Sequence, residues 1–574
     1  MTTHATTETT CDVLIIGSGN AGLSAAISAA QSSPQSRIHL IDKSPPTWAG
    51  GNSYFTAGAF RSTHEGLASL LPLVNNVSPD LAAKIDLPAY TAEDFMADLA
   101  RVTNGRTRRD LAHTLIDDSY ETVRWLRSVG VRFQLSLNRQ AYEVNGRMRF
   151  WGGLALKTEE GGKGLVRDLM RAAEDLGVVF SFGTAARRLI TDSRGRVTSV
   201  EVMGRRQQQQ PGGGDGMTTT TYTIQARKGV ILAAGGFEAA AHLRAQYLGP
   251  KWDMALVRGT PFNTGECLEM AVRDVAARTA GNWSGCHCVA WDARAPAESG
   301  DREVSNEYTK SGYPLGVMVN RRGERFIDEG SDMRNYTYAV VGRAILDQPG
   351  HVAYQIWDAR TSGWLRSEEY REEVVDRITA DSLPELAQKL ARDDDPGAGG
   401  GLNDPDRFLR VLTEYNRAVY ARQACDEQAG RAASRGWNPS VKDGLSTQSS
   451  AGRLEIDKTN WALPIDQPPF LAVKVSAGIT FTFGGLAVEP ATAAVVSSIS
   501  GARITGLYCV GEMMGGLFYD NYPGGSGLTS GAVFGRRAGR DAVRWSSPWG
   551  FFMYQIQSNT AALIPYMINI SDRL

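Results

Sequence analysis

The pattern of apolar residues predicts a strand, a glycine-rich turn, a helix and a second strand at the start of the chain. The run "CDVLIIG" from Cys11 is short, apolar and closed by glycine, as buried parallel strands are. The alanine-rich "AGLSAAISAAQ" then favours a helix, and residues 37–43 ("RIHLIDK") favour a second strand. The chain therefore opens as an α/β unit built on a parallel sheet.

Helix and strand patterns return in blocks further along the chain. Residues 92–129 carry apolar side chains at helical spacing, and residues 164–190 indicate a helix followed by two strands. Strands are also expected in "GRVTSVEV", "TYTIQARKGVILAAGGF" and "GARITGLYCVGE". Residues 204–221 have low complexity and predict a disordered hairpin tip, and residues 392–406 predict a flexible surface loop.

The middle of the chain lacks this rhythm, which predicts an interrupted domain. Between residues 259 and 475, helical patterns alternate with tryptophan- and tyrosine-rich segments. We therefore expect an α/β fold in which a Rossmann-like domain is split by an inserted α+β capping domain. The predicted parts are a disordered start (1–10), a first Rossmann-like part (11–258), the capping domain (259–475), a second Rossmann-like part (476–545) and a tail (546–574). The apolar tail is either a packing arm or oligomer contact, or a poorly specified extension.

Composition limits the classes of function. Hydrophobic residues make up 42% and charged residues 21%, as in a globular protein with a real core. The net charge of −1 gives no basic surface for nucleic acid. Six scattered cysteines fit a reducing compartment better than a disulfide scaffold. Since no signal-like start and no apolar run of about 18 residues is visible, we expect a cytoplasmic protein without a membrane span.

A glycine-rich turn follows the first predicted strand. Gly17, Gly19 and Gly22 form G-x-G-x-x-G, which serves a tight turn, close approach of backbone to a pyrophosphate, and close packing of helix on strand. The N-terminus of the helix adds positive partial charge. Asp42 follows about 20 residues later, where a carboxylate accepts hydrogen bonds from an adenosine ribose. These spacings predict a bound dinucleotide; the alternative is that the glycines serve packing alone.

Three further turns rich in small residues indicate FAD rather than NAD. "WAGGNSYFTAGAF" follows Asp42, "VILAAGGF" ends another strand, and "LYCVGEMMGG" ends a third. Glu512, in the last of these, is placed to accept hydrogen bonds from a ribityl or ribose chain. Four such turns on four strand ends suit an extended FAD better than a nicotinamide dinucleotide.

These residues resemble the flavoprotein family of fumarate reductases, succinate dehydrogenases and 3-ketosteroid dehydrogenases. The resemblance covers about residues 10 to 545 and is closest to the tricarballylate dehydrogenase-like branch. It is carried by "GGNS", "WSGCH", "RFIDEGSDMRNYTYA", "KTNWALPIDQPPF", "GITFTFGGL" and "NYPGGSGLTSGAVFGRRAG". The resemblance implies that the split domain binds FAD, and that the late turn at Asn521–Gly531 lies beside the first turn and closes on the flavin ring.

The resemblance also extends the set of FAD contacts. Members with covalent FAD attach it through a histidine after the first glycines of the "GGNS" motif; here Tyr54 and Phe55 follow, so we expect non-covalent FAD. The predicted FAD-binding residues are Gly17, Gly19, Asn20, Ala21, Gly22, Asp42, Lys43, Gly50, Gly51, Asn52, Ser53, Ala57, Gly58, Ala186, Ala234, Gly235, Gly236, Glu512, Ser526, Gly527 and Leu528.

The family chemistry needs an acid/base and groups that bind the activating carboxylate or carbonyl. Arg334 matches the proton-shuttle arginine of fumarate reductases. Guanidinium barely deprotonates, so Tyr336 and Tyr338 are candidates to share that work when the enzyme oxidises. The alternative for Arg334 is a surface salt bridge.

Three more positions match the family's substrate site. His287 matches a histidine that binds a substrate carboxylate, or it is a structural core histidine. Thr480 and Tyr522 stand where fumarate reductases have a histidine and an arginine, which makes succinate and fumarate poor candidates as substrates. In ketosteroid dehydrogenases a "YPG" turn presents the tyrosine hydroxyl to a ketone; a packed aromatic is the alternative for Tyr522. Cysteines flank His287, but adjacent residues cannot easily converge on one ion, so we expect no metal site.

The resulting hypothesis is an FAD-dependent oxidoreductase, similar to tricarballylate dehydrogenase, that acts on a CH–CH bond beside a carboxylate or carbonyl. The hydride would pass to flavin N5, and the proton would pass to an acid–base made of arginine and tyrosine. One alternative is a desaturase or reductase of a cyclic or polyketide-like ketone. Another is a flavin-binding protein without turnover. The expected partners are a small-molecule substrate and an electron acceptor or donor that the sequence leaves open, as it does the direction of reaction and the oligomeric state.

Overall fold

The structure is a computed structural model that describes residues 9–209, 215–304, 306–393, 399–429, 441–449 and 454–544. The predicted tail at 546–574 lies outside these residues, as do residues 1–8 of the predicted disordered start. Thr9 and Thr10 belong to the first strand, so the prediction of disorder is wrong for those two residues.

The first sheet is the one that the opening pattern predicts. Its order is β10-β11-β12-β1-β2-β9, with β20 beside β12 and β19 beside β20. β1 pairs in parallel with β2 and β12, and β12 pairs in parallel with β20. The strands are β1 (Thr9–Ile16), β2 (Ile38–Ile41), β9 (Val179–Ser181), β10 (Ala185–Thr191), β11 (Val197–Gln209), β12 (Asp215–Leu232), β19 (Ala494–Val496) and β20 (Arg503–Cys509).

The low-complexity segment forms a longer hairpin than expected. Antiparallel pairs between β11 and β12 continue from Gly204↔Thr220 to Gln209↔Asp215. The prediction of a hairpin is confirmed, but the prediction of disorder is wrong where backbone pairing extends into the low-complexity sequence. Residues 210–214 lie outside the described part of the chain.

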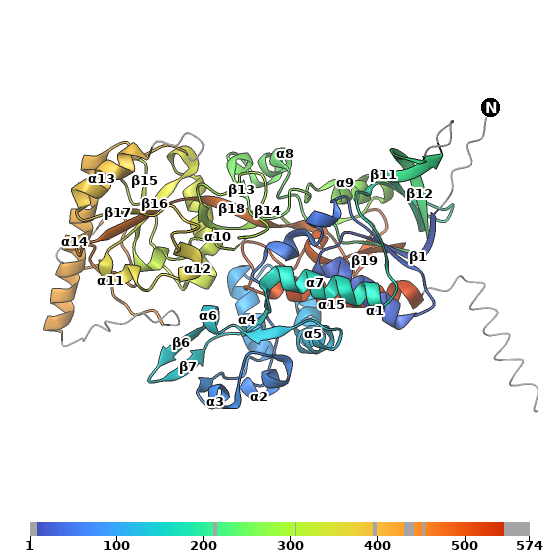
Figure 1. The fold of residues 1–574 in the computed structure, drawn as a ribbon, viewed down its shortest axis with the longest axis horizontal. Helices are drawn as coiled ribbons and strands as arrows, with labels where there is room; N and C mark the ends of the chain where they lie inside the picture. The colour runs from blue at the N-terminus through green and yellow to red at the C-terminus, as the bar shows by residue number, and fades with distance from the viewer. Residues whose placement is uncertain are drawn as a thin grey trace, which may run out of the picture.

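The second sheet is organised around one long strand, β18. It pairs with β13, β14, β16 and β17, and β15 pairs with β16. Figure 1 shows β18 running from the lobe that holds β15–β17 toward the centre of the molecule. The boundary predicted between residues 475 and 476 falls inside this continuous strand. The strands are β13 (Leu256–Val257), β14 (Thr279–Asp292), β15 (Val317–Asn320), β16 (Ala353–Trp357), β17 (Ile378–Ala380) and β18 (Phe470–Leu486).

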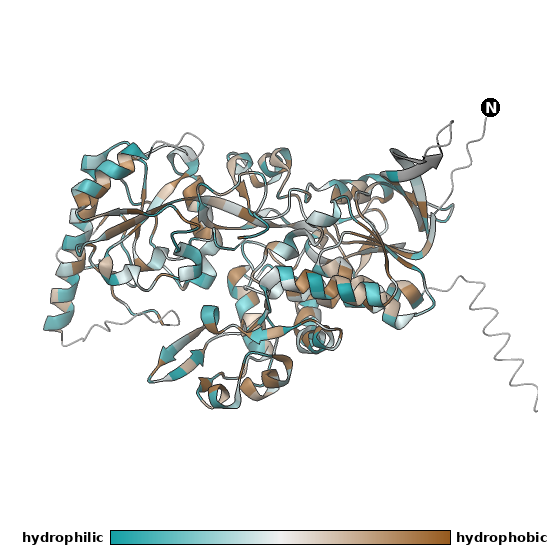
Figure 2. Ribbon diagram, in the orientation of Figure 1, coloured by the Kyte–Doolittle hydropathy of each residue, from teal (hydrophilic) through white to brown (hydrophobic). Residues whose placement is uncertain are grey.

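Smaller sheets and helices complete the fold. Figure 2 shows hydrophobic colouring along the central strands and hydrophilic colouring on outer helix faces such as those of α13 and α14. The short strands are β3 (Ala59–Phe60), β4 (Ile85–Asp86), β5 (Phe133–Leu135), β6 (Ala141–Val144), β7 (Arg147–Phe150) and β8 (Leu156–Thr158). The helices are α1 (Asn20–Ser32), α2 (Leu67–Leu70), α3 (Pro79–Ala82), α4 (Ala92–Val102), α5 (Arg109–Ser128), α6 (Leu137–Gln140), α7 (Gly161–Asp175), α8 (Ala241–Leu243), α9 (Glu266–Val275), α10 (Arg334–Leu346), α11 (Ala359–Ser362), α12 (Ser367–Tyr370), α13 (Leu383–Arg392), α14 (Pro405–Gln428) and α15 (Ser526–Arg544).

Helices α1 and α15 bring the two ends of the described chain together. A Cβ on Gly535 would lie 2.5 Å from the Ala21 carbonyl oxygen, so glycine permits the close crossing. Asn20 Nδ2 donates to the Leu528 carbonyl at 2.8 Å. The expectation that the early and late glycine turns are neighbours is therefore confirmed. No helix in the described ranges has both the length and the apolar character to cross a bilayer.

Candidate active site

A cleft lies where the early and late glycine turns meet. Gly17 has φ +112°, and a Cβ there would lie 2.3 Å from the Ala233 carbonyl oxygen. A Cβ on Gly22 would lie 2.0 Å from the Gly17 carbonyl oxygen, so these two glycines let the turn pack on the sheet. Gly19 instead faces the cleft, where the nearest atom to an added Cβ is 3.6 Å away. The division of roles fits a pyrophosphate lying against Gly19.

Most of the predicted FAD contacts line this cleft, and the rest support it. The lining includes Gly17, Gly19, Asn20, Ala21, Asp42, Lys43, Gly51, Asn52, Ser53, Ala186, Ala234, Gly235, Glu512, Gly527 and Leu528. The other predicted contacts, which are not among the lining residues, are Gly22, Gly50, Ala57, Gly58, Gly236 and Ser526. Gly58 shows the supporting role, since its Cβ would lie 1.9 Å from Thr158 Oγ1.

Asp42 lines the cleft at the end of β2 and also ties the glycine turn together. Its Oδ2 accepts hydrogen bonds from Ser18 N at 2.8 Å and Ser18 Oγ at 2.6 Å, and its Oδ1 accepts one from Ser44 N at 2.8 Å. A carboxylate oxygen has room for a further donor. This geometry suits the predicted bond to a ribose hydroxyl.

Replacing Asp42 with alanine should weaken FAD binding by about 10- to 100-fold, because a charge-assisted hydrogen bond and the order of the turn are lost together. Titrating deflavinated protein with FAD and following quenching of flavin fluorescence measures this. Asp12→Ala is the matched control, since Asp12 Oδ2 accepts from Arg37 N at 2.8 Å near the same strands without lining the cleft. Equal affinities for both variants would contradict the ribose contact.

Glu512 has a buried partner that the sequence analysis missed. Glu512 Oε1 accepts from Thr482 N at 2.8 Å, and Glu238 Oε1 accepts from Asn263 Nδ2 at 2.6 Å and from Asn52 Nδ2. Burial raises the pKa of both carboxyl groups, and the Glu238 charge raises that of Glu512 further. The raised pKa favours the protonated form of Glu512, which lines the cleft and in that form can donate as well as accept a hydrogen bond.

A bulge in β18 presents Thr480 to the cleft. His287 on β14 pairs with Phe481, whereas the next residue, Cys288, pairs with Ile479, which leaves Thr480 as the extra residue on β18. Its carbonyl accepts from Asn52 Nδ2 at 2.8 Å, and Thr480 and Phe481 both line the cleft. Bulges re-aim side chains in this way beside active sites.

Tyr522 and His287 meet at this end of the cleft. Their rings are edge to face with centroids 4.8 Å apart, and His287 Nδ1 lies 3.1 Å from Asn521 Oδ1. Burial, followed by the cation of Arg258, lowers the pKa of His287 to about 3, so the ring is neutral near pH 7. Burial raises the pKa of Tyr522, so its hydroxyl keeps its proton. The pair thus offers neutral hydrogen-bonding groups.

Arg334 is the first residue of α10, and it is not a surface salt bridge. It is half-buried, and no carboxylate in the described ranges lies within 4.0 Å of its guanidinium. Burial, with the cation of Arg366, lowers the pKa of Arg334. Arg366 itself is paired with Glu369 at 2.9 Å, on α12. Burial would raise the pKa of Glu369, but Arg366, Arg139 and Arg334 outweigh it and lower the pKa to about 2.

The two candidate tyrosines have different surroundings. The Tyr336 hydroxyl donates to Asp98 Oδ1 at 3.1 Å, and the guanidinium of Arg101 lies 3.8 Å from its ring centroid. Burial raises the pKa of Tyr336 to about 12, and Asp98 adds to this. Tyr338 instead meets the His287 ring edge to face at 6.3 Å. Tyr338 is therefore the tyrosine that faces the candidate site.

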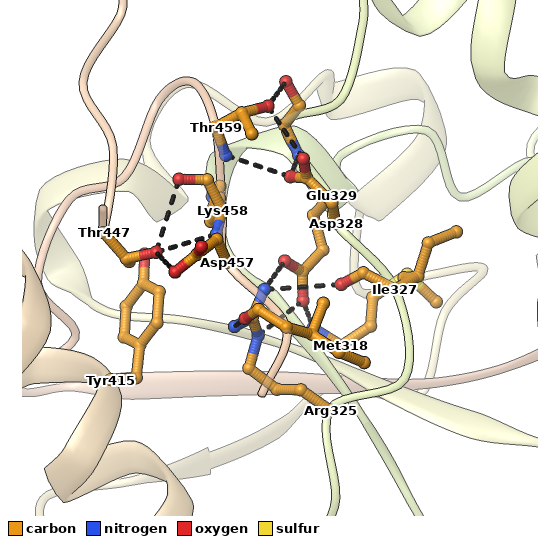
Figure 3. Close-up of polar contacts among 12 residues, drawn as sticks. Met318, Arg325, Ile327, Asp328, Glu329, Tyr415, Thr447, Asp457, Lys458 and Thr459 are labelled. Carbon is orange, nitrogen blue, oxygen red and sulfur yellow. Dashed lines mark hydrogen bonds and ion pairs between the residues drawn. The ribbon is translucent and has the colours of Figure 1, made fainter. Parts of the chain in front are cut away.

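A buried polar cluster holds the segment that leads into α10, as Figure 3 shows. Arg325 Nη2 forms an ion pair with Glu329 Oε2 at 2.5 Å, and Thr459 Oγ1 donates to Asp328 Oδ2 at 2.7 Å. Arg325, Asp328 and Glu329 belong to the "RFIDEGSDMR" motif and Thr459 to "KTNWALPIDQPPF"; they hold the segment that precedes Arg334 rather than join the site. No group of three His, Cys, Asp or Glu side chains in the described part of the chain is arranged to hold a metal.

Comparisons with known proteins agree on one family. The model of the FAD binding domain family matches residues 12–528. A probable fumarate reductase of Shewanella frigidimarina is 26% identical over 537 residues, which cover 93% of this chain and 75% of the relative. A 4-oxocyclohexanecarboxylate 2-dehydrogenase of Sinomonas cyclohexanicum is 26% identical over 594 residues, which cover 93% of each. The solved open conformation of a flavocytochrome c3 fumarate reductase aligns with a TM-score of 0.64 at 23% identity, over 94% of this chain and 79% of that one.

Proposed function

Because the chain belongs to the FAD-binding family that includes fumarate reductase flavoproteins, and is an FAD-dependent oxidoreductase of CH–CH groups, we propose that its substrate carries a carboxylate beside the reacting carbons. FAD supplies hydride transfer when it is bound. The protein must bind and orient the substrate, and it must move the proton that accompanies the hydride.

One arrangement supports the proposal: His287 meets Tyr522 at the Thr480 end of the cleft, and Tyr338, which meets His287, stands four residues after Arg334 on α10. Arg334 provides a half-buried guanidinium whose lowered pKa eases proton transfer in either direction. His287 and Tyr522 can donate hydrogen bonds to a carboxylate or carbonyl oxygen without adding charge. Tyr338 lies against His287 and follows Arg334 by four residues on α10, so the two side chains share a helix face, and we assign Tyr338 the exchange of a proton with Arg334.

A keto acid is a second candidate substrate. No hydrogen-bond partner of the Tyr522 hydroxyl is found in the described residues, and the Tyr522 ring packs among aromatic rings, with the Phe481 and Phe518 centroids 5.3 and 5.5 Å from its own. That setting suits a ketone oxygen. The Sinomonas relative is named for a substrate with both a ketone and a carboxylate.

Other features stay proposals. The division into FAD-binding parts and a capping domain is supported by the separate sheet around β16 and β18. Non-covalent attachment is supported by Tyr54, whose ring is stacked on Arg302 at 3.5 Å where covalent relatives carry a histidine. A cytoplasmic location is supported by the six cysteines, none of which forms a disulfide in the structure.

An anaerobic titration of the yellow holoenzyme tests the proposed function. Tricarballylate and 4-oxocyclohexanecarboxylate are added in separate experiments, and the visible flavin band is followed. We expect at least one of them to bleach the band within seconds. Bleaching by the keto acid alone would favour the second candidate. The contrary result has two parts: neither acid bleaches a flavin that dithionite can reduce, and the reduced enzyme forms neither acid from its desaturated product. A flavin-binding protein without turnover then becomes the better interpretation.

A further inference from the structure

Arg258 is, like Arg334, a half-buried arginine without a carboxylate partner among the described residues. It follows β13, and its backbone N–H donates to the Ile479 carbonyl at 2.9 Å, directly before the bulged residue Thr480. Its Nη2 donates to Asn306 Oδ1 at 3.2 Å, but its Nε is buried with no hydrogen-bond partner. In the described ranges, no carboxylate lies within 4.0 Å of its guanidinium.

Arg258 is one of a few such arginines: among the described residues, Arg302 and Arg536 also have a buried guanidinium nitrogen without a hydrogen-bond partner. Other enclosed guanidinium groups have carboxylates or several carbonyl groups as partners: Arg61 with Asp98 at 2.6 Å, Arg325 with Glu329 at 2.5 Å, Arg366 with Glu369 at 2.9 Å, and Arg244 with the carbonyls of Glu238, Trp252, Asp253 and Ala255. A guanidinium removed from water without such partners is costly. An anion that arrives with the substrate would remove that cost.

The position of Arg258 connects it to the substrate end of the cleft. Its charge acts on Tyr522, whose pKa it lowers against the effect of burial, and on His287. Both Arg258 and Arg334 also interact electrostatically with Tyr338. Two cations without a carboxylate partner in the described ranges therefore act electrostatically on Tyr338, one from the residue after β13 and the other from the first residue of α10.

We propose that Arg258 binds a second carboxylate of the substrate, which makes the enzyme selective for dicarboxylates or tricarboxylates. The inference rests on the proposed function. It explains how a site with threonine at position 480 and tyrosine at position 522 still holds a polyanion: the cation comes from the neighbouring strand β13. The fork of guanidinium donors suits a carboxylate, and at least Nε is available for it.

A purely structural role is the competing explanation. The Arg258 guanidinium lies 5.1 Å from the centroid of the Trp291 ring, so stacking could be its only purpose. Arg302 is a matched control, because it also stacks on an aromatic ring, that of Tyr54 at 3.5 Å, and has a buried Nη1 without a partner. Arg302 stands two residues after Gly300, whose N–H donates to the Gly259 carbonyl at 2.6 Å, and it is not among the residues that line the cleft.

The test compares binding of tricarballylate, succinate and butyrate to oxidised holoenzyme, read from perturbation of the flavin spectrum. Arg258→Gln should weaken tricarballylate and succinate by about 10- to 100-fold and change butyrate by no more than about threefold. Arg258→Lys should restore part of the loss, because it keeps the charge but not the fork. Arg302→Gln should leave all three affinities unchanged. Flavin content and thermal unfolding show whether Arg258→Gln has folded. If it has not, the affinities of Arg258→Lys are compared with those of the wild type instead.

The outcomes separate the two levels of the argument. If the wild type prefers tricarballylate over butyrate but Arg258→Gln keeps that preference, Arg258 is structural and the proposed function stands. An equal loss for all three acids has the same meaning. If the wild type turns over a monocarboxylate keto acid and shows no preference for polyanions, the inference is overturned alone. A wild type that binds no carboxylate overturns the proposed function and this inference with it.

Discussion

Arg334→Lys is expected to lower kcat by about 10³- to 10⁴-fold while FAD binding and folding stay unchanged. General acid–base groups contribute factors of this size, and the substitution replaces a rigid fork by a flexible ammonium group that no longer reaches both the substrate and Tyr338. Arg334 has no ion-pair partner among the described residues, so its replacement breaks no salt bridge. The loss should therefore be kinetic.

Stopped-flow bleaching of the flavin band by a substrate found in the titration measures this step directly. The rate at saturating substrate should fall, while the dissociation constant from the same traces changes by less than about tenfold. Arg360→Lys is the control, since Arg360 pairs with Asp466 at 3.0 Å and is not among the residues that line the cleft. An Arg334→Lys enzyme within tenfold of the wild-type rate would remove Arg334 from proton transfer.

The regular elements of the FAD-binding part could be predicted because their signals are local. "CDVLIIG" is apolar throughout because β1 is buried between β2 and β12, and the glycines after it have steric reasons that lie within a few residues. The sequence predicts a shorter hairpin of β11 and β12 than the structure has, because no local hydrophobic signal marks the outer part of these strands. Polar low-complexity residues carry no hydrophobic pattern, yet backbone pairing continues through them to Gln209↔Asp215.

The candidate site was only partly predictable, because several members have no motif. Arg258 and Glu238 became visible through their surroundings: a buried Nε without a partner, and a carboxyl group beside Glu512. The choice between Tyr336 and Tyr338 depended on which way each faces from α10. Both tyrosines lie within four residues of Arg334, so the sequence does not decide which of them faces the site. In the structure the Tyr336 hydroxyl donates to Asp98, whereas the Tyr338 ring meets His287.

The same limits apply to the late turn. "NYPGG" indicates a tyrosine at the substrate end, but the aromatic group around it comes from distant segments. Phe481, Phe483 and Phe518 surround the Tyr522 ring at centroid distances of 5.3, 6.4 and 5.5 Å. These rings hold the position of Tyr522 even if its hydroxyl is removed, so the hydroxyl can be tested separately from the ring.

Tyr522→Phe is expected to lower kcat/KM for a keto acid by about 10²- to 10³-fold, the usual cost of removing one donor to a developing oxyanion. For a substrate that is activated only by carboxylates, the expected loss is below about tenfold, because Arg258 and Arg334 would supply the stabilising charge. The ring packing stays, so thermal unfolding should not change. Tyr420→Phe is the control, since Tyr420 is exposed on α14 and its hydroxyl donates to Asp466.

Comparing the two substrate types in one variant decides between the two candidate functions. A large loss confined to the keto acid means that Tyr522 polarises a ketone, and that the departure from an arginine at this position created a site for a carbonyl. Small losses for both substrates mean that Tyr522 packs against His287 and leaves the chemistry to the arginines. A large loss for the carboxylate substrate would contradict the assignment of the carboxylate-binding role to Arg258, since a phenol would then carry what we attribute to a cation.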